Sequence, residues 1–351
     1  MSMESRPTRS VVALSLTSVS LWFLVACAPQ TAVRDGSADS ASPWFSVGFH
    51  ESGQTLRIHL NADKSSQTLS ELARSAVQEV NRRIAPAGEG SVLAAVNREA
   101  GHMAVKVPED LRVLVRRSLA FHRLTDGAVD PTDGPVRALW AREHPPSSEE
   151  TREALGKTGS PVIGVDEFEG TLHIRRAEVA IDLGPMGRAY ALAVASQRLE
   201  TAGAERYRLD YGSLSVLGYD GGRFWKLPLP DGPGTPPRAR RWARVSGGAV
   251  STLSRADGGR GPLLDVIDPR TGNPVRTLSF VLVVSSDPVQ SAAMAQALAV
   301  LGRTKGMEIV ETLEGVEGLV IDLAGYVHAS SGLRSEVFQE PILDASNQAR
   351  H

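Results

Sequence analysis

The sequence predicts an α+β protein: one compact domain with mixed or antiparallel sheets and flanking helices. Helical and strand-like patterns are mixed without the regular βαβ rhythm that a parallel sheet requires. No Pro/Ser-rich linker interrupts residues 44–340. The 351 residues are 42% hydrophobic and 22% charged, which is ordinary globular composition. The formal net charge of −2 gives no electrostatic basis for binding nucleic acid.

The N-terminus has the pattern of a secretory signal. Arg6 and Arg9 precede an apolar run over 11–26, which is shorter than the roughly 20 residues of a membrane span. Cys27, the only cysteine of the chain, follows at once, and this arrangement resembles a bacterial lipobox. We therefore expect a signal peptide over 1–26, lipidation at Cys27 and a polar tether over 27–43. An ordinary signal peptide followed by an incidental cysteine is the alternative.

The residue after the cysteine suggests where the lipoprotein resides. By resemblance to sorted lipoproteins, an aspartate directly after the cysteine indicates the inner membrane, and this chain has Ala28 there. We expect a cell-envelope protein that faces the periplasm from the outer membrane. With no second cysteine, an intramolecular disulfide is excluded.

Periodicity places the elements of the domain in order. Alternation predicts strands over 44–50 and 55–60, and helical spacing predicts helices over 69–84 and 107–124, the second with Pro and acids in its first turn. Residues 145–159 predict a loop with a short helix. Later strands are expected over 162–165, 171–174, 178–182, 206–217, 222–227, 243–252, 264–267 and 280–285. Helices are expected over 188–202, 289–301 and 306–313, a loop over 231–241 and a closing hairpin over 318–329.

The stretch Leu124–Pro135 is the most informative segment. It reads LTDGAVDPTDGP, with three carboxylates, two glycines and two prolines in a run with little apolar content. Gly and Pro shape turns, so the segment predicts a loop that directs carboxylates and backbone amides toward a ligand. A solvated turn is the alternative reading of the same residues.

Three further segments accompany this loop. Residues 180–190 (AIDLGPMGRAY) predict a strand that ends at Asp182 and enters a helix through a Gly-rich turn, where backbone amides can approach a phosphate. Residues 264–274 (LDVIDPRTGNP) centre on Asp268 and also fit a type I turn. Residues 290–302 fit an Ala-rich buried helix that ends at glycine.

In this order and spacing the four segments resemble the FAD:protein FMN transferase (ApbE-like) family, whose fold is related to the T-fold. The family loop Thr-Asp-Gly-Ala-Phe-Asp-Pro-Thr is matched by residues 125–132, with Val129 in place of Phe. The family turn Asp-Leu-Gly-Gly…Gly-Tyr-Ala is matched at 182–184 and 190–191, and the family motif His-Ile-Ile-Asp-Pro-Arg-Thr-Gly-Tyr-Pro at 266–272 and at 274. The resemblance covers about 44–335, which we expect to form the transferase domain, followed by a tail over 336–351.

The resemblance implies a reaction and a site. Members move FMN from FAD to a Thr or Ser hydroxyl of a partner protein, usually with Mg²⁺ bridging the phosphates, and AMP leaves. The partner is expected to be a flavin-acceptor protein of a redox system, and the sequence does not define the oligomeric state. The residues implied to contact FAD are Ala128, Val129, Asp130, Asp182, Arg188 and Ile267; those implied in catalysis are Asp268 and Asp265.

The departures from the family pattern concentrate at the metal. Relatives hold Mg²⁺ with an Asp and a Thr of the Ala-rich helix, and these positions are Ala292 and Gln296 here. Mg²⁺ requires hard oxygen ligands, and alanine has none while glutamine offers only a neutral carbonyl oxygen. We therefore predict that neither residue is a metal ligand. Two hypotheses follow: a transferase with an altered metal site, or an impaired member that binds flavin or a partner. A structural lipoprotein without a ligand is the third.

Overall fold

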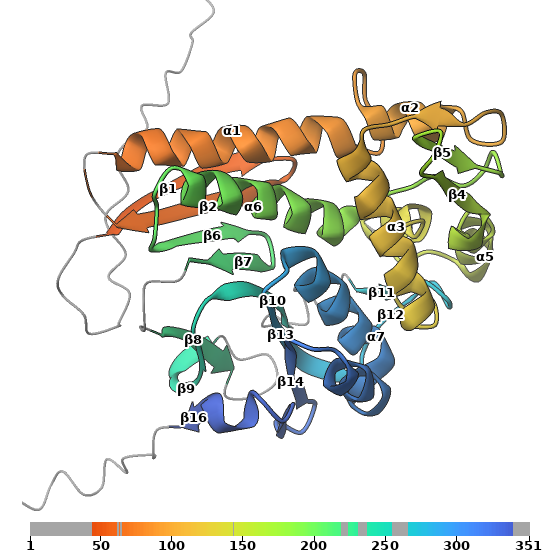
Figure 1. Cartoon of the computed structure of the whole chain (residues 1–351). Helices are drawn as coiled ribbons and strands as arrows, with labels where there is room; N and C mark the ends of the chain where they lie inside the picture. The colour runs from red at the N-terminus through yellow and green to blue at the C-terminus, as the bar shows by residue number, and fades with distance from the viewer. Residues whose placement is uncertain are drawn as a thin grey trace, which may run out of the picture. The chain divides into compact units, whose positions relative to one another are not determined.

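The computed structural model describes residues 44–61, 63, 65–142, 144–218, 224–230, 237–254 and 266–339. The predicted signal peptide, Cys27, the tether and Asp265 lie outside these ranges. The main sheet has eight strands, each antiparallel to its neighbours (Figure 1). Their order is β1 (Trp44–Glu51), β2 (Gln54–Asn61), β6 (Tyr207–Tyr211), β7 (Leu214–Leu217), β10 (Gly248–Ser254), β13 (Leu278–Ser285), β14 (Val316–Asp322) and β15 (Val327–Ala329).

Three long helices cover one face of this sheet. α1 (Ser66–Ile84) packs on α6 (Gly184–Thr201), α6 packs on α7 (Pro288–Thr312), and α7 lies on β10, β13 and β14. α7 is interrupted at Gly302, whose φ is 74°, so the expected break between two helical segments is confirmed. The expected α1 is also confirmed, and it begins three residues early, at Ser66, next to the Asp63 turn.

The other face packs on a small sheet of β16 (Val337–Gln339), β9 (Pro237–Val245) and β8 (Trp225–Pro230). Residues of β13 alternate between two cores: Val281 and Val283 belong to the core under the helices, whereas Phe280 and Leu282 join the core with β8 and β9. Since both faces of β13 are covered, its sequence is a continuous apolar run. This explains why the strand was easily predicted.

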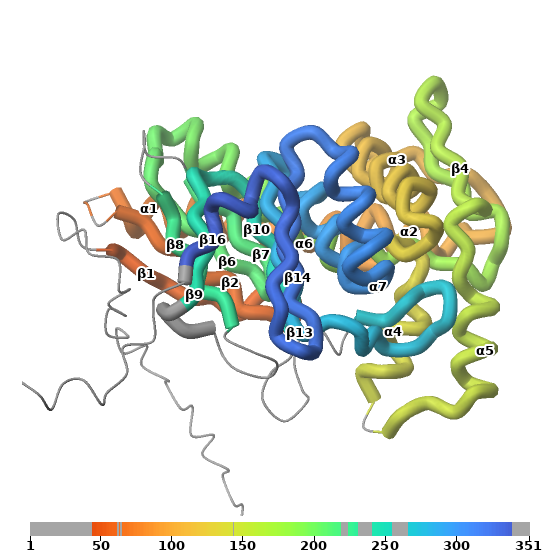
Figure 2. Tube along the Cα trace, turned by 90° about the horizontal axis from the view of Figure 1, so that it is seen from below, coloured from red at the N-terminus to blue at the C-terminus, as the bar shows by residue number. Residues whose placement is uncertain are grey.

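A helical layer stands beside the main sheet. It contains α2 (Val92–Arg98), α3 (Glu109–Leu124), α4 (Gly134–Trp140), α5 (Ser148–Gly156) and a sheet of β3 (Val105–Lys106), β5 (Thr171–Ile174) and β4 (Ile163–Asp166). Within the described domain, α4 and α5 lie at the opposite end from β8 and β16 (Figure 2). A small apolar cluster joins α4 and α5 to β11 (Ile267–Asp268), which pairs with β12 (Asn273–Pro274). Short 3₁₀ turns are η1 (Ser160–Val162) and η3 (Arg334–Glu336).

The strand expected over 178–182 is wrong. The segment is irregular, and its backbone groups bond outside any ladder: Ile181 N–H donates to Asn97 Oδ1 (2.8 Å), and Asp182 N–H donates to the Pro131 carbonyl (2.7 Å). Asn97 Nδ2 donates in turn to the Ile181 carbonyl (2.9 Å). The Asn97 side-chain amide thus provides the hydrogen bonds to Ile181 that a neighbouring strand would otherwise provide. The helix that follows starts at Gly184, earlier than expected, because Pro185 suits a first turn.

Two other expectations need correction. The loop expected over 231–241 gives way to β9 from Pro237, because the backbone of this segment pairs with β8 and, from Arg241, with β16. The single strand expected over 243–252 is two strands, β9 and β10, separated where Gly247 and Gly248 have positive φ. A short helix, α2, was missed; Ser91 caps it by accepting from Ala94 N–H (3.3 Å).

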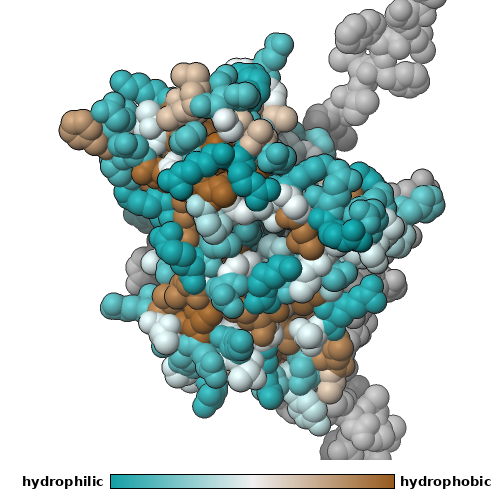
Figure 3. All heavy atoms as spheres, turned by 90° about the vertical axis from the view of Figure 1, so that its right-hand side faces the viewer, coloured by the Kyte–Doolittle hydropathy of each residue, from teal (hydrophilic) through white to brown (hydrophobic). Residues whose placement is uncertain are grey.

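Hydrophilic side chains predominate on the face of Figure 3, which is the right-hand side of Figure 1. Hydrophobic side chains show there in separate groups. None of the helices within the described ranges combines the length and the apolar character that crossing a bilayer needs.

Candidate active site

The Asp/Gly/Pro loop is built around Asp130, which is buried. Its Oδ1 accepts from Thr132 N–H (2.7 Å), Thr132 Oγ1 (2.6 Å) and Ser160 Oγ (2.6 Å), and its Oδ2 lies 3.4 Å from His122 Nδ1. Thr132 Oγ1 also accepts from Gly159 N–H (2.8 Å). With this many partners, the carboxylate organises the loop.

The two residues before Asp130 are equally enclosed. Ala128 and Val129 have no exposed surface, and Val129 N–H donates to Thr125 Oγ1 (3.1 Å). In this structure the side chains of 128–130 therefore shape the loop from inside. Their predicted contact with FAD stays a prediction.

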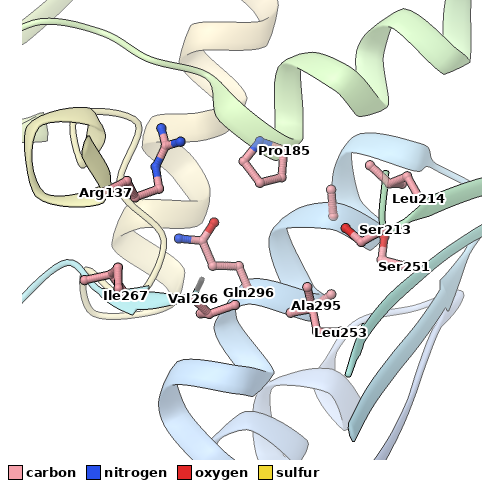
Figure 4. A pocket seen from close by; sticks show the side chains of 11 residues that line it. Arg137, Pro185, Ser213, Leu214, Ser251, Leu253, Val266, Ile267, Ala295 and Gln296 are labelled. Atoms are coloured by element: carbon pink, nitrogen blue, oxygen red, sulfur yellow. The ribbon is translucent and has the colours of Figure 1, made fainter. Parts of the chain in front are cut away.

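A pocket opens where six elements of the chain meet (Figure 4). The space between its walls is about 460 Å³, counting space that is open to solvent. One wall comes from α4 and β11, with Arg137 and Ile267. The opposite walls come from α7, β7 and β10, and Pro185 at the N-terminus of α6 borders it. A helix N-terminus favours an anionic ligand.

Arg137 is the charged centre of this site. Its Nε donates to Asp133 Oδ1 (2.7 Å), and its Nη2 lies 2.8 Å from Asp182 Oδ2. The second contact is an ion pair at hydrogen-bond distance, and Nη2 has no hydrogen bond of regular geometry to another described residue. Burial alone lowers the pKa of Arg137, but Asp133 and Asp182 outweigh it and the pKa rises. Arg137 therefore stays charged.

Gly184 permits this close approach. Its φ is 45°, and a Cβ there would lie 3.1 Å from Arg137 Nη2. Its N–H donates to Asp182 Oδ1 (3.0 Å). The Gly-rich turn that the sequence predicted as a phosphate contact thus makes room for an arginine, and the structure brings Asp182 beside the loop as expected.

Asp133 is the most perturbed carboxyl group of the site. Its side chain is 5% exposed, and burial raises its pKa to about 6. Arg137 opposes this rise, while the charges of Asp182 and Asp130 add to it. Asp133 thus changes charge near neutral pH, a property that perturbed groups at functional sites often have.

Arg188 is a second, half-buried cation near the site. It follows Pro185 by one helical turn and lies against Gly212, the neighbour of the pocket residue Ser213. Its Nε is buried without a hydrogen-bond partner, and within the described ranges the side chain forms no ion pair. Burial, followed by the charge of Arg137, lowers its pKa. Arg188 is not itself one of the residues that line the pocket; it lies near the start of α6, after the lining residue Pro185, and the charge of Asp182 partly offsets the lowering of its pKa.

The positions of the family's metal ligands also line the pocket. Ala292 is buried and offers no ligand atom, and Gln296 Nε2 is 3.5 Å from Asp133 Oδ2. Across the described part of the chain, no group of three or more His, Cys, Asp or Glu side chains is arranged to hold a metal ion.

Asp268 follows the pocket residue Ile267 in β11 and does not itself line the pocket. Both of its oxygens are engaged by Arg270, whose Nε and Nη2 donate at 2.9 and 2.8 Å. Ile267 is 2% exposed and lines the pocket as predicted for a contact residue. Catalytic roles for Asp268 and Asp265 stay predictions, since Asp265 lies outside the described residues.

Sequence reasoning missed Arg137, Asp133 and the serines of the pocket. Ser251 shares a hydrogen bond with Ser291 (Oγ–Oγ 2.8 Å), behind the wall that Ser213 also forms. The available signal was the charge at 137 within the apolar run 136–140, four residues after Asp133. A charged side chain in such a run has a buried partner or a ligand.

Fold and site together define an α+β protein with a pocket whose one charged lining residue is the half-buried Arg137. The model of the ApbE family matches residues 52–320, and the chain belongs to this family. It is similar to the FAD:protein FMN transferase of Haemophilus influenzae, with 22% identity over 308 residues, 82% of this chain and 86% of the relative. The corresponding protein of Vibrio cholerae is 26% identical over 285 residues, 75% of this chain and 84% of the relative.

Solved structures have the same fold. The flavin transferase ApbE from Vibrio cholerae superposes with a TM-score of 0.74 at 21% identity, covering 84% of this chain and all of that one. The ApbE protein of Thermotoga maritima gives 0.72 at 24% identity, covering 85% of this chain and all of that one. The predicted α+β class is confirmed.

Proposed function

We propose that the chain is an FAD:protein FMN transferase, which moves FMN from FAD to a Thr or Ser hydroxyl of a partner protein. The observation that carries this proposal is the cationic pocket around Arg137, formed by the segments that match the family. The names of the relatives support a transferase over a non-catalytic flavin-binding member. FAD is accordingly the substrate.

The transfer balances without a redox step. The acceptor hydroxyl oxygen forms a new bond to the FMN phosphorus, and the bond from this phosphorus to the bridging oxygen breaks. AMP leaves with the bonding electron pair. The hydroxyl proton passes to a carboxylate near the pocket, for which Asp268 is the described candidate and Asp265 the second. Positioning and charge neutralisation supply most of the catalysis in such reactions.

The residues present do not fit the Mg²⁺ ion that the family implies. Mg²⁺ favours near-octahedral oxygen coordination, and the two positions on α7 supply an alanine and a neutral amide. The nearby carboxylates of Asp133 and Asp182 already face the Arg137 guanidinium. No step of the proposed transfer therefore involves the metal.

The proposed setting is the cell envelope. A signal peptide over 1–26 and lipidation at Cys27 would anchor the protein to the outer membrane, with the tether over 27–43 reaching into the periplasm. The partner would be a flavin-acceptor protein of a redox system. Lipid labelling of cells that express the chain or Cys27→Ala tests the anchor: labelling should be lost in the variant, and equal labelling would refute it.

The activity is tested with the full-length chain in detergent. Incubation with FAD and an acceptor peptide for flavinylation, with and without Mg²⁺, should give covalent flavin fluorescence on the peptide and equimolar AMP. FMN in place of FAD is the matched control, because it lacks the pyrophosphate bond and should give no label. Absence of label under every metal condition, while a relative labels the same peptide, would refute the proposal.

A further inference from the structure

We infer that Arg137 and Arg188 bind the pyrophosphate of FAD and supply the positive charge that a divalent ion supplies elsewhere, so that this pocket works without a metal. The inference rests on the proposed function, because it takes FAD as the ligand. It concerns how the substrate's charge is neutralised, which can be measured apart from turnover.

The carboxylates of Asp133 and Asp182 are already paired with a cation, the guanidinium of Arg137. Arg137 lies against both Asp133 and Asp182, at 2.7 and 2.8 Å. A divalent ion at these carboxylates would have to displace the guanidinium and then lie beside its charge. The neighbouring Gln296 faces Asp133 through its amide nitrogen, which cannot ligate a cation. The site is therefore arranged around an arginine.

Both arginines have a buried donor without a regular hydrogen bond, although Arg137 Nη2 is also in an ion pair with Asp182. Arg137 Nη2 and Arg188 Nε are two of the four buried side-chain polar atoms without a hydrogen-bond partner in the described part of the chain. A buried donor without an acceptor costs free energy, and such groups are rare in folded proteins. A ligand that brings acceptor oxygens would satisfy both.

The charge balance of the two arginines also favours an anionic ligand. Arg188 forms no ion pair with another described residue, and burial followed by the charge of Arg137 lowers its pKa. Two cations are thus held near one another, with an excess of positive charge whenever Asp133 is protonated. A phosphate group relieves this repulsion, and guanidinium donors match phosphate oxygens well. The N-terminus of α6 at Pro185 adds to the attraction.

The step that follows is simple. As the bond to the leaving AMP breaks, negative charge builds on its phosphate oxygens. Donors that are fixed before the reaction stabilise this charge without reorganising. Arg137 is fixed by two carboxylates, whereas Arg188 is held by burial alone. Arg137 therefore orients the phosphates, and Arg188 adds charge.

Ligand binding to the full-length chain in EDTA tests the inference. The probes are FAD, ADP and riboflavin, and affinities are measured by flavin fluorescence or calorimetry. FAD and ADP should bind in EDTA, and added Mg²⁺ should leave their affinity unchanged within about threefold. Arg188→Gln should weaken the binding of FAD and ADP about 10- to 100-fold, because a charge-assisted hydrogen bond is lost. The binding of riboflavin, which has no phosphate, should be unaffected.

Two matched controls guard against unfolding. Arg198→Gln removes a cation from the same helix, and Arg142→Gln removes one just after α4; both pair with surface glutamates and should leave FAD binding unchanged. Arg137→Lys keeps the positive charge but loses the planar set of guanidinium donors, and it should weaken ADP binding less than Arg137→Gln does.

The outcomes separate the two proposals. If FAD binds only with Mg²⁺, or if Arg188→Gln binds FAD and ADP like the parent chain, the inference is wrong while the transferase proposal stands. If FAD binds in EDTA but no acceptor is ever labelled, the binding inference stands and the proposed function fails.

Discussion

Arg137 and Asp182 lie 2.8 Å apart between Nη2 and Oδ2, and this contact joins the loop side of the site to the start of α6. The Asp182 backbone adds a second link, since its N–H donates to the Pro131 carbonyl. The pocket wall therefore depends on an ion pair between segments that are distant in the sequence.

We predict that Arg137→Met destabilises the fold by about 1.5–3 kcal/mol, the scale for losing a charged hydrogen bond at a half-buried site. The cause is that Asp133 and Asp182 lose their counter-ion. Urea denaturation of the full chain measures the change. Adding Asp133→Asn to the variant should recover part of the loss, because one buried charge is removed with its partner. Additive effects of the two changes would contradict the coupling.

Asp133 predicts a pH dependence of stability. Its folded pKa is raised to about 6 from 3.8, so the protonated form is favoured in the fold. The stabilisation that the protonated Asp133 carboxyl group contributes is complete below about pH 3.8 and is lost as the pH rises through about 6. The difference in unfolding free energy between Asp133→Asn and the parent chain should therefore grow in favour of the variant from pH 4 to about 7. A difference that is constant across this range would contradict the assignment.

The loop around Asp130 predicts a structural effect. Thr132→Val removes one hydroxyl that donates to Asp130 and accepts from Gly159 N–H. We expect a loss of about 1–3 kcal/mol in unfolding free energy and weaker FAD binding. Thr201→Val is the control, since the Thr201 hydroxyl bonds only within its own exposed turn of α6. Equal stability of the two variants would show that the network does not shape the loop.

These sites show how far the sequence could be read. The Asp/Gly/Pro loop was recognised because its composition excludes a core segment, and β13 because an apolar run marks a strand covered on both faces. Asp182 was placed near the loop, but through a strand that does not exist. The backbone of Ile181 is hydrogen-bonded to the Asn97 side chain, and no local sequence pattern predicts a side-chain partner so distant in the sequence.

The charge of the site was harder to predict. Ala292 and Gln296 indicated that the metal ligands are lost, whereas what replaces them depends on Arg137, which lies on another element. Its meaning comes from Asp182 and from the approach that Gly184 allows. Such a relationship arises only when the chain is folded, so spacing along the sequence could not reveal it.

Restoring the family's metal ligands should not be sufficient to restore the metal. Ala292→Asp with Gln296→Thr places oxygens in the pocket, but the Arg137 charge still opposes a divalent ion. We expect no Mg²⁺-dependent rise in melting temperature for this double variant, and a rise once Arg137→Met is added. Thermal unfolding against Mg²⁺ concentration measures this. A Mg²⁺-dependent rise in the double variant itself would contradict the blocking role of Arg137.

The mass of an acceptor protein after incubation with FAD and the full-length chain in EDTA tests the central claim most directly. The account predicts that the acceptor gains one FMN moiety in the presence of the chelator, at a rate that Mg²⁺ leaves essentially unchanged and that Arg188→Gln lowers. An acceptor that stays unmodified in EDTA and gains FMN only when Mg²⁺ is restored would contradict it.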